Sequence, residues 1–325
     1  MKTAHIADLH HNPNRHKKVL WILDQVKEIA PDVSLITNSG ENFHNPYNFN
    51  AALDELLDKW QEITAIRPVA TIRATHGQHE RDKMLEMLLR VGVTILEPGT
   101  GYYLKNNDIY RDPTLPEEVD DIRLILFGVP HPHKAHILKD KKMSRDEANA
   151  AVNAAIIQIY NRCGALRAGF PNIPALAIGH GVVRGKNTSE IKALSADIYS
   201  SEADLTLMNC DFYAWGHYHK PVEFEIIRGG YLGSFAWDFN ECDYKPAITI
   251  FDWDSMTASR HELDINIKKK ILMFPGDVIP DLTGCDVHLV NNQTEWTEAD
   301  CKEKGAGLVK VTTEIEKNIK SDLKR

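Results

Sequence analysis

Short apolar runs and amphipathic stretches of helical spacing alternate along the first third of the chain. The apolar runs predict strands over residues 3–7, 32–37, 68–74 and 93–96. Between them, apolar residues recur every three or four positions, which predicts helices over residues 15–29, 53–63 and about 80–91. This strand–helix alternation is typical of a mostly parallel sheet with helices packed on its faces.

The pattern changes in the middle of the chain. Apolar runs predict strands over residues 123–129, 174–178 and 211–215, and a long amphipathic helix is expected over 144–163. Shorter strands with more alternation follow, around residues 223–227, 246–252 and 257–264. Because no helices separate these short strands, we expect them to form a second, more antiparallel sheet packed on the first. The sequence thus indicates an α/β protein with two sheets.

The composition shifts again near residue 265. A Lys268–Lys270 run precedes Pro275 and Pro280, and is interpreted as a hinge or as a site that steers a polyanion. Strands over residues 287–290 and 307–311 then flank a predicted helix over 297–304. We therefore predict two domains, a large one over residues 1–264 and a small α+β capping domain over residues 265–325.

Polar residues suited to metal binding gather at the carboxyl ends of the predicted strands. In open parallel sheets these ends meet at one edge, where functional groups collect. We expect the two members of each Asp-x-His or His-x-His pair to leave an extended segment on the same side. The candidates are Asp8, His10, Glu41, Gln78, His79, His180, His217 and His219.

These side chains offer carboxylate oxygens, one amide oxygen and imidazole nitrogens, and no thiolate. Such a set suits manganese, iron, zinc or magnesium, with manganese the expected activator. Taken alone, the His217-Tyr218-His219 pair is equally consistent with loop histidines that make ordinary hydrogen bonds. What favours a metal site is that candidate ligands follow five different predicted strands.

The overall composition excludes several classes of protein for this chain. The chain has 325 residues, 43% of them hydrophobic, and a net charge of −8, which argues against wholesale adhesion to nucleic acid or membrane. Its five cysteines are scattered without a Cys-x-x-Cys pair, so we expect reduced thiols and a cytoplasmic location. No apolar run approaches ~18 residues, so no membrane span is predicted.

A basic run in the middle of this acidic chain has two interpretations. Such runs are usually solvated helix starts, but they can also steer a polyanion such as a DNA backbone. The candidate DNA-binding residues are Lys134, Lys139, Lys141, Lys142, Arg145 and Arg184. The nearby His131, His133 and His136 are better explained as surface-loop residues than as a second metal site.

Five motifs in order resemble those of the calcineurin-like metallophosphoesterases. They are Asp8-Leu9-His10, Gly40-Glu41-Asn42-Phe43-His44, Gly77-Gln78-His79-Glu80, Gly179-His180 and Gly216-His217-Tyr218-His219. The resemblance covers about residues 3–220. It implies a four-layered α/β/β/α sandwich of two mixed sheets flanked by helices, and a two-metal phosphodiesterase activity.

One further stretch is similar to the SbcD-type branch of DNA repair exonucleases. Gly230-Tyr231-Leu232-Gly233-Ser234, followed by Phe239-Asn240-Glu241, resembles the Tyr-Pro-Gly-Ser…Phe-x-Glu segment of that branch. This implies an exonuclease or endonuclease that acts on DNA in repair or recombination, as a homodimer with an SMC-like ATPase of the SbcC type. The branch contacts its ATPase through a helical segment after the capping domain, and this sequence ends at Arg325.

The family resemblance also implies roles for single residues. One metal would be held by the residues at Asp8, His10, Glu41 and His219, and the other by those at Glu41, Gln78, His180 and His217. Glu41 would bridge the two ions. His79 would be catalytic, because it matches the family histidine that stabilises the transition state or protonates the leaving oxygen.

The sequence departs from the family pattern around two motifs. Glu41 and Gln78 stand where the family has Asp and Asn, and each adds one methylene, a displacement of about 1.3–1.5 Å. His44 replaces a family Asp, and Asn38-Ser39 replaces a small apolar lead-in. Because metal–ligand distances tolerate only tenths of an ångström, two alternatives stay open: a non-catalytic metal-binding scaffold and a small-molecule (nucleotide) phosphoesterase.

Overall fold

The structure is a computed structural model of the 325-residue chain. It describes residues 1–43, 51–73, 82–111, 121–130, 144–188, 199–233, 244–265, 267–272, 277–290 and 296–312. The chain divides into two compact units. The large unit comprises Met1–Ala236 and Pro246–His261, and the small unit comprises Trp237–Lys245 and Glu262–Arg325.

Six strands form the first sheet of the large unit. Their order is β15 (Thr257–Glu262), β14 (Ala247–Asp252), β1 (Lys2–Ile6), β2 (Leu35–Asn38), β3 (Val69–Ile72) and β4 (Val93–Leu96). Strands β1 to β4 are parallel, and β14 pairs antiparallel with β1. The prediction that β14 and β15 belong to the second sheet is wrong. They extend the first sheet, because β14 covers the edge that β1 would otherwise leave unpaired.

Seven strands form the second sheet, in the order β12 (Val222–Glu223), β13 (Gly229–Tyr231), β11 (Phe212–Gly216), β8 (Ala175–His180), β7 (Ile122–Val129), β5 (Gly101–Lys105) and β6 (Asp108–Arg111). This sheet is mixed, because β13, β11, β8 and β7 run parallel while β5 pairs antiparallel with β7 and β6. Strands β9 (Val182–Arg184) and β10 (Tyr199–Ser201) form a separate parallel pair.

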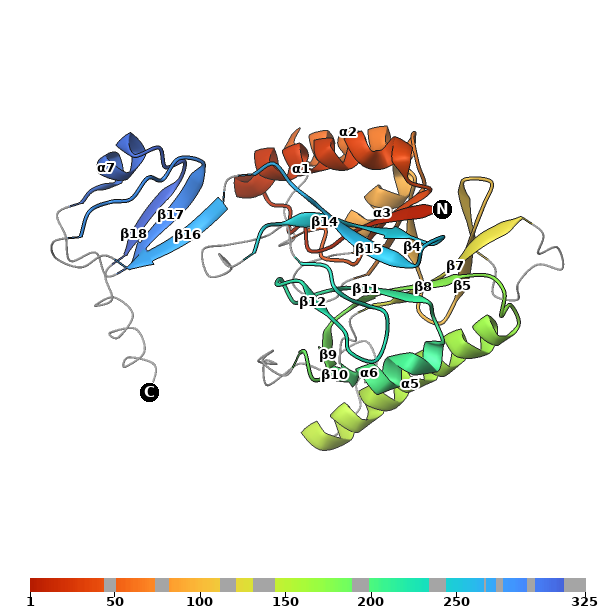
Figure 1. Cartoon of the computed structure of the whole chain (residues 1–325). Coiled ribbons are helices and arrows are strands. Elements are labelled where there is room, and N and C mark those ends of the chain that lie inside the picture. The colour runs from red at the N-terminus through yellow and green to blue at the C-terminus, as the bar shows by residue number, and fades with distance from the viewer. Residues whose placement is uncertain are drawn as a thin grey trace. The chain divides into compact units, whose positions relative to one another are not determined.

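Helices cover the outer faces of both sheets (Figure 1). On the first sheet lie α1 (His16–Ile29), α2 (Ala51–Thr64) and α3 (Asp82–Arg90), and on the second lie α5 (Arg145–Ala168) and α6 (Glu202–Leu205). Short 3-10 helices are η1 (Pro13–Arg15), η2 (Ala30–Asp32) and η3 (Thr206–Met208). Ser144 and Glu147 form a capping box that fixes where α5 begins. The large unit is therefore the predicted sandwich of two mixed sheets between helical layers.

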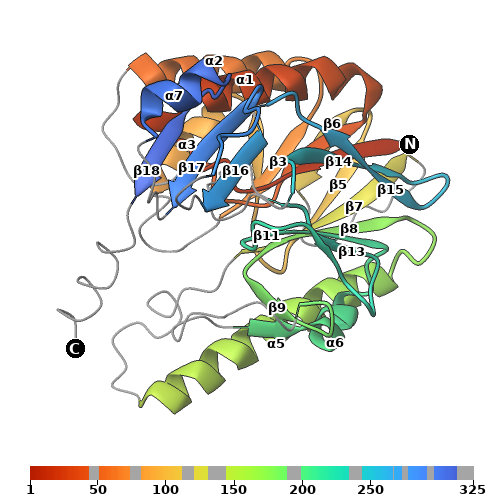
Figure 2. The same ribbon diagram turned by 60° about the vertical axis from the view of Figure 1, so that its left-hand side comes forward.

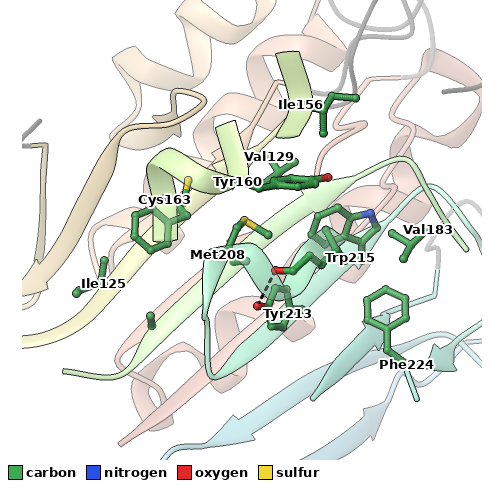
Figure 3. Packing of buried hydrophobic residues seen from close by; sticks show 14 of the residues in the cluster. Ile125, Val129, Ile156, Tyr160, Cys163, Val183, Met208, Tyr213, Trp215 and Phe224 are labelled. Carbon is green, nitrogen blue, oxygen red and sulfur yellow. Dashed lines mark hydrogen bonds between the residues drawn. The ribbon is translucent and has the colours of Figure 1, made fainter. Parts of the chain in front are cut away.

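Two apolar layers hold the sandwich together, and β7 contributes to both. Leu124 and Leu126 face the layer between the sheets, which also contains Phe212 and Phe251. Ile125 and its alternate neighbours face the layer beneath α5. Figure 3 shows this second layer, with Tyr160, Cys163, Met208 and Trp215 packed together. Both faces of β7 are buried, as is expected of a central strand covered on both sides.

In the small unit, the described residues form a three-stranded parallel sheet and one helix (Figure 2). Its elements are β16 (Ile267–Leu272), β17 (Cys285–Val290), α7 (Glu298–Glu303) and β18 (Val309–Thr312). The interpretation of Lys268–Lys270 as a hinge is wrong, because these residues lie in β16 in register with Asp286–His288. Across both units, none of the described helices combines the length and apolarity that crossing a membrane requires.

Candidate metal centre

The loops that follow β1 and β2 run side by side and carry the first candidate ligands. The backbone N–H of Asp8 donates to the carbonyl of Gly40 at 3.1 Å, and that of His10 donates to the carbonyl of Glu41 at 2.8 Å. The N–H of His11 donates to the carbonyl of Asn42 at 2.9 Å. These bonds continue the pairing beyond the ends of the two strands, so Asp8, His10 and Glu41 are held against one another by backbone contacts.

Four of the candidate ligands adopt a left-handed backbone. The φ angles are 54° at Asp8, 46° at His10, 50° at Glu41 and 94° at His217. The expected extended geometry of the Asp-x-His and His-x-His pairs is therefore wrong. Left-handed backbone costs about 1–3 kcal/mol at a non-glycine residue and collects at functional sites, where the turn aims a side chain.

The described candidate ligands lie in two groups that share one residue. Asp8, His10, Glu41 and His219 form the first group, which we call group 1, and Glu41, His180 and His217 form group 2. Within each group, one ligand atom per residue lies within 4.8 Å of all the others. The two histidines of the His-x-His pair thus belong to different groups, and in each group two imidazoles meet edge to face.

Glu41 presents one carboxylate oxygen to each group. Its Oε2 lies 2.8 Å from Nε2 of His10, and its Oε1 lies 3.6 Å from Nε2 of His180. Both histidines and Glu41 are buried. A single carboxylate with its two oxygens turned to two sets of nitrogen and oxygen donors is the arrangement needed to bridge a pair of cations.

Burial places two carboxylates in a site with little water. Burial raises the pKa of Asp8 to about 7, with the nearby His180 opposing this rise and Glu41 adding to it. Burial also pushes the pKa of Glu41 upward, but the charge of His180 and hydrogen bonds from His10 and His180 outweigh it, and the pKa lies well below its usual range. Burial lowers the pKa of His180, but Glu41 and Asp8 raise it to about 9.

The rise at Asp8 comes chiefly from burial, whereas the shifts of Glu41 and His180 come from buried negative charge that attracts positive charge beside it. Protonated imidazoles supply such charge, and divalent cations supply more of it. The donors are all oxygen and nitrogen atoms, as hard and borderline divalent ions prefer. The described residues therefore fit a pair of divalent ions, with Asp8, His10 and His219 on one side of Glu41 and His180 and His217 on the other.

A shell of hydrogen bonds orients these side chains. Nδ1 of His180 donates to the carbonyl of Ser39 at 2.8 Å, which turns Nε2 toward Glu41. The hydroxyl of Ser39 donates to the carbonyl of Ala214 at 2.9 Å, and the N–H of His217 donates to both carboxylate oxygens of Asp8, at 3.1 and 3.2 Å. In the sequence, Ser39 stood out only as a departure from the family pattern. Its role in linking the two sheets could not be predicted, because its hydrogen bonds join residues far apart in the chain.

Gly216 allows the two sheets to approach each other at the site. A Cβ at this position would lie 2.7 Å from the carbonyl oxygen of Ser39 and 2.9 Å from Nδ1 of His180. Both distances are far below van der Waals contact. The glycine before His217 is therefore needed because the loop after β2 and the ring of His180 occupy the space of its missing side chain.

Several predicted site residues lie outside the described part of the chain. These are Gln78, His79, His44, His131, His133, His136, Lys134, Lys139, Lys141 and Lys142. Arg145 is the first residue of α5, and its side chain also lies outside the described part. Arg184 is described, at the end of β9, and its side chain is exposed.

One family model matches the part of the chain that carries this arrangement. The model of the calcineurin-like phosphoesterase family matches residues 1–221, which include every member of groups 1 and 2. No curated protein matches the chain. Among solved structures, the sulfate thiohydrolase SoxB of Thermus thermophilus, in complex with glycerol, is 10% identical with a TM-score of 0.38.

That similarity covers 81% of this chain and 56% of the SoxB chain, so this chain spans little more than half of that protein's length. The family match covers well over half of the 325 residues and includes the strands that carry both groups of ligands. The chain belongs to the calcineurin-like phosphoesterase family, whose members bind divalent metal ions.

Proposed function

We propose that this protein is a two-metal phosphodiesterase that cleaves DNA. The observation that supports this best is the position of Glu41, which belongs to both ligand groups and turns one oxygen to each. Two divalent cations, when bound there, would neutralise charge on a phosphodiester and lower the pKa of an attacking water. Asp8, His10 and His219 would hold one ion, and His180 and His217, together with Gln78, the other.

The geometry at position 41 supports an intact metal site despite the lengthened carboxylate. The backbone of Glu41 is left-handed, and Gly40 and Asn42 on either side pair with the loop after β1. The oxygens still reach both histidine sets. Left-handed backbone at four ligand positions is typical of a functional site and supports an intact metal site.

The choice of DNA as the substrate rests on the resemblance to the SbcD-type branch. Tyr231, from the stretch that carries this resemblance, donates its hydroxyl to the carbonyl of Gly181, directly after the candidate ligand His180. That stretch thus supports the candidate site. On the same resemblance we propose a homodimer that works with an SMC-like ATPase partner of the SbcC type.

The protein is expected to bind two divalent ions per chain and to cleave linear DNA with manganese as the best activator. The test is elemental analysis and calorimetry on protein stripped with a chelator, followed by assays on DNA, on nucleotides and on bis(p-nitrophenyl) phosphate. Less than one ion per chain at millimolar manganese would contradict the two-metal site. Hydrolysis of the small substrates without DNA cleavage would favour the small-molecule alternative, and metal binding without any hydrolysis would favour the scaffold.

His79→Ala is expected to lower the rate of DNA cleavage by about 10²–10⁴-fold, the usual contribution of a general acid. Metal content should stay at the wild-type value, because His79 is assigned to the substrate and not to either ligand group. The matched control is His261→Ala, which removes an exposed imidazole from β15 and should leave the rate unchanged. Loss of metal together with activity would make His79 a ligand instead.

A further inference from the structure

Arg184, at the end of β9, lies flat against an aromatic ring. Its guanidinium carbon is 3.5 Å from the centroid of Tyr199, on the paired strand β10. Both side chains are exposed, Tyr199 by 44%. Among the described residues, no carboxylate forms an ion pair with this guanidinium, which is stacked on the ring of Tyr199. Lys186, two residues later, differs because it pairs with Glu225 at 3.2 Å.

The junction between β8, which ends at the candidate ligand His180, and β9, which carries Arg184, is held by hydrogen bonds. The carbonyl of Gly181, directly after His180, accepts hydrogen bonds from the indole of Trp215 at 3.1 Å and from the hydroxyl of Tyr231 at 3.0 Å. The same hydroxyl accepts the N–H of Val183 at 2.6 Å. Because both donors come from strands of the second sheet, β9 leaves the candidate site in one defined direction.

The strand beneath Tyr199 is fixed as well. Ser200 points to the other side of β10, where its hydroxyl is hydrogen-bonded to that of Tyr160 in α5 at 2.8 Å. The next residue, Ser201, caps the N-terminus of α6. Arg184 and Tyr199 are therefore an exposed pair on a rigid support, which we call the Arg184–Tyr199 platform.

The platform is close to the candidate metal centre along the chain. Arg184 follows the candidate ligand His180 by four residues, so its Cα is at most about 14 Å from that of His180. A guanidinium stacked on a ring keeps the N–H groups at its edge free for two parallel hydrogen bonds to a phosphate. Stacking also limits the rotamers that would otherwise be lost on binding.

We propose that the Arg184–Tyr199 platform binds a backbone phosphate of the DNA substrate, a few nucleotides from the scissile bond. This inference rests on the proposed nuclease function and names a residue that positions its substrate. In a chain of net charge −8, binding of a polyanion depends on such local, uncompensated cations.

Arg184→Gln is expected to weaken the binding of a fluorescein-labelled DNA oligonucleotide about tenfold and to raise the KM for its cleavage by a similar factor, the size of one lost charge-assisted contact. The kcat and the metal content should change less than about twofold, because Arg184 belongs to neither ligand group. The hydrolysis of bis(p-nitrophenyl) phosphate should change equally little, because that substrate lacks the neighbouring phosphate that the platform would bind. The salt dependence, d log K/d log [salt], should become shallower by about 0.7–0.9.

Matched variants separate the platform from general charge. Lys186→Gln removes the same charge two residues away and should weaken DNA binding less than about twofold. Tyr199→Phe keeps the ring and should bind DNA as the wild type does, whereas Tyr199→Leu should weaken binding several-fold because the guanidinium loses its support.

Four results would overturn the inference. The first is equal weakening by Arg184→Gln and Lys186→Gln, which would indicate nonspecific charge. The second is loss of metal or of bis(p-nitrophenyl) phosphate hydrolysis in Arg184→Gln, which would indicate a structural role. The third is a wild-type protein that hydrolyses the small phosphodiester but neither binds nor cleaves DNA, which would overturn the proposed DNA substrate as well. The fourth is unchanged DNA binding in Arg184→Gln while the wild-type protein cleaves DNA. This would overturn the role of the platform and leave the proposed nuclease function standing.

Discussion

Replacing Glu41 with glutamine is expected to remove both divalent ions and to abolish phosphodiester cleavage. Glu41 is the member that groups 1 and 2 share, and its two oxygens face His10 and His180. The amide has the same shape but lacks the negative charge, and its nitrogen cannot act as a ligand to a cation. The loss of manganese affinity should exceed the ~10–100-fold that is typical of removing an outer-shell partner.

The measurement is a calorimetric manganese titration of the chelated protein, with activity assayed in parallel. Glu202→Gln is the matched control, because Glu202 is also a buried glutamate of the large unit and accepts hydrogen bonds from the backbone of Glu225 and Ile226, away from the ligand groups. Binding of two ions with wild-type affinity in the Glu41→Gln protein would show that Glu41 does not bridge them.

Gly216→Ala is expected to disrupt group 2 while group 1 keeps its ion. The new methyl group would enter between the carbonyl oxygen of Ser39 and Nδ1 of His180, two atoms that are hydrogen-bonded at 2.8 Å. Turning His180 away from Glu41 should lower the affinity of the second ion by about 10–100-fold. Overpacking should also reduce the free energy of unfolding by about 1–3 kcal/mol.

The two effects are separated by a manganese titration and by unfolding in urea. Gly169→Ala is the control, because a Cβ at this helix-capping glycine would meet only the carbonyl oxygen of Leu166, at 3.4 Å. It should leave both quantities near the wild-type values. Two-site binding of wild-type affinity in the Gly216→Ala protein would mean that the loops move apart without disturbing His180.

Hydrophobic periodicity predicted the elements of the first sheet well and their long-range partners poorly. Strand β4 has the predicted bounds, and the apolar stripe predicted from Leu53 to Ile63 lies on the buried side of α2. No strand was predicted for the β5–β6 hairpin. Its turn residues Asn106 and Asn107 both have positive φ, as a tight hairpin turn requires, and asparagine is a residue type suited to such turns. The attachment of β14 to β1 could not be predicted, because pairing partners are not encoded in local alternation.

For the candidate site, the sequence indicated which strand ends carry the ligands but not how they are aimed. Glutamate has no preference for left-handed backbone, so the residue type of Glu41 does not predict its φ angle. Histidine is enriched there, but only as a small minority of all histidines, so its type does not single out His10 or His217. Those angles follow from contacts between distant segments, such as the bond from Asp8 to Gly40. Local patterns therefore predicted an extended chain where tertiary pairing imposes turns.

The pairing of β1 with β14 has a consequence for the order in which the protein acquires activity during synthesis. Lys2 pairs with Asp252, so the second neighbour of the first strand is made 250 residues later. At ~5–20 residues per second, a ribosome needs about 12–50 s to cover that distance. His217 and His219 also come late, after two thirds of the chain. A nascent or prematurely released chain that ends before residue 217 carries Asp8 and Glu41 but lacks two of the imidazoles of the cluster, so a hydrolase built in this order stays inert until its large unit is nearly complete.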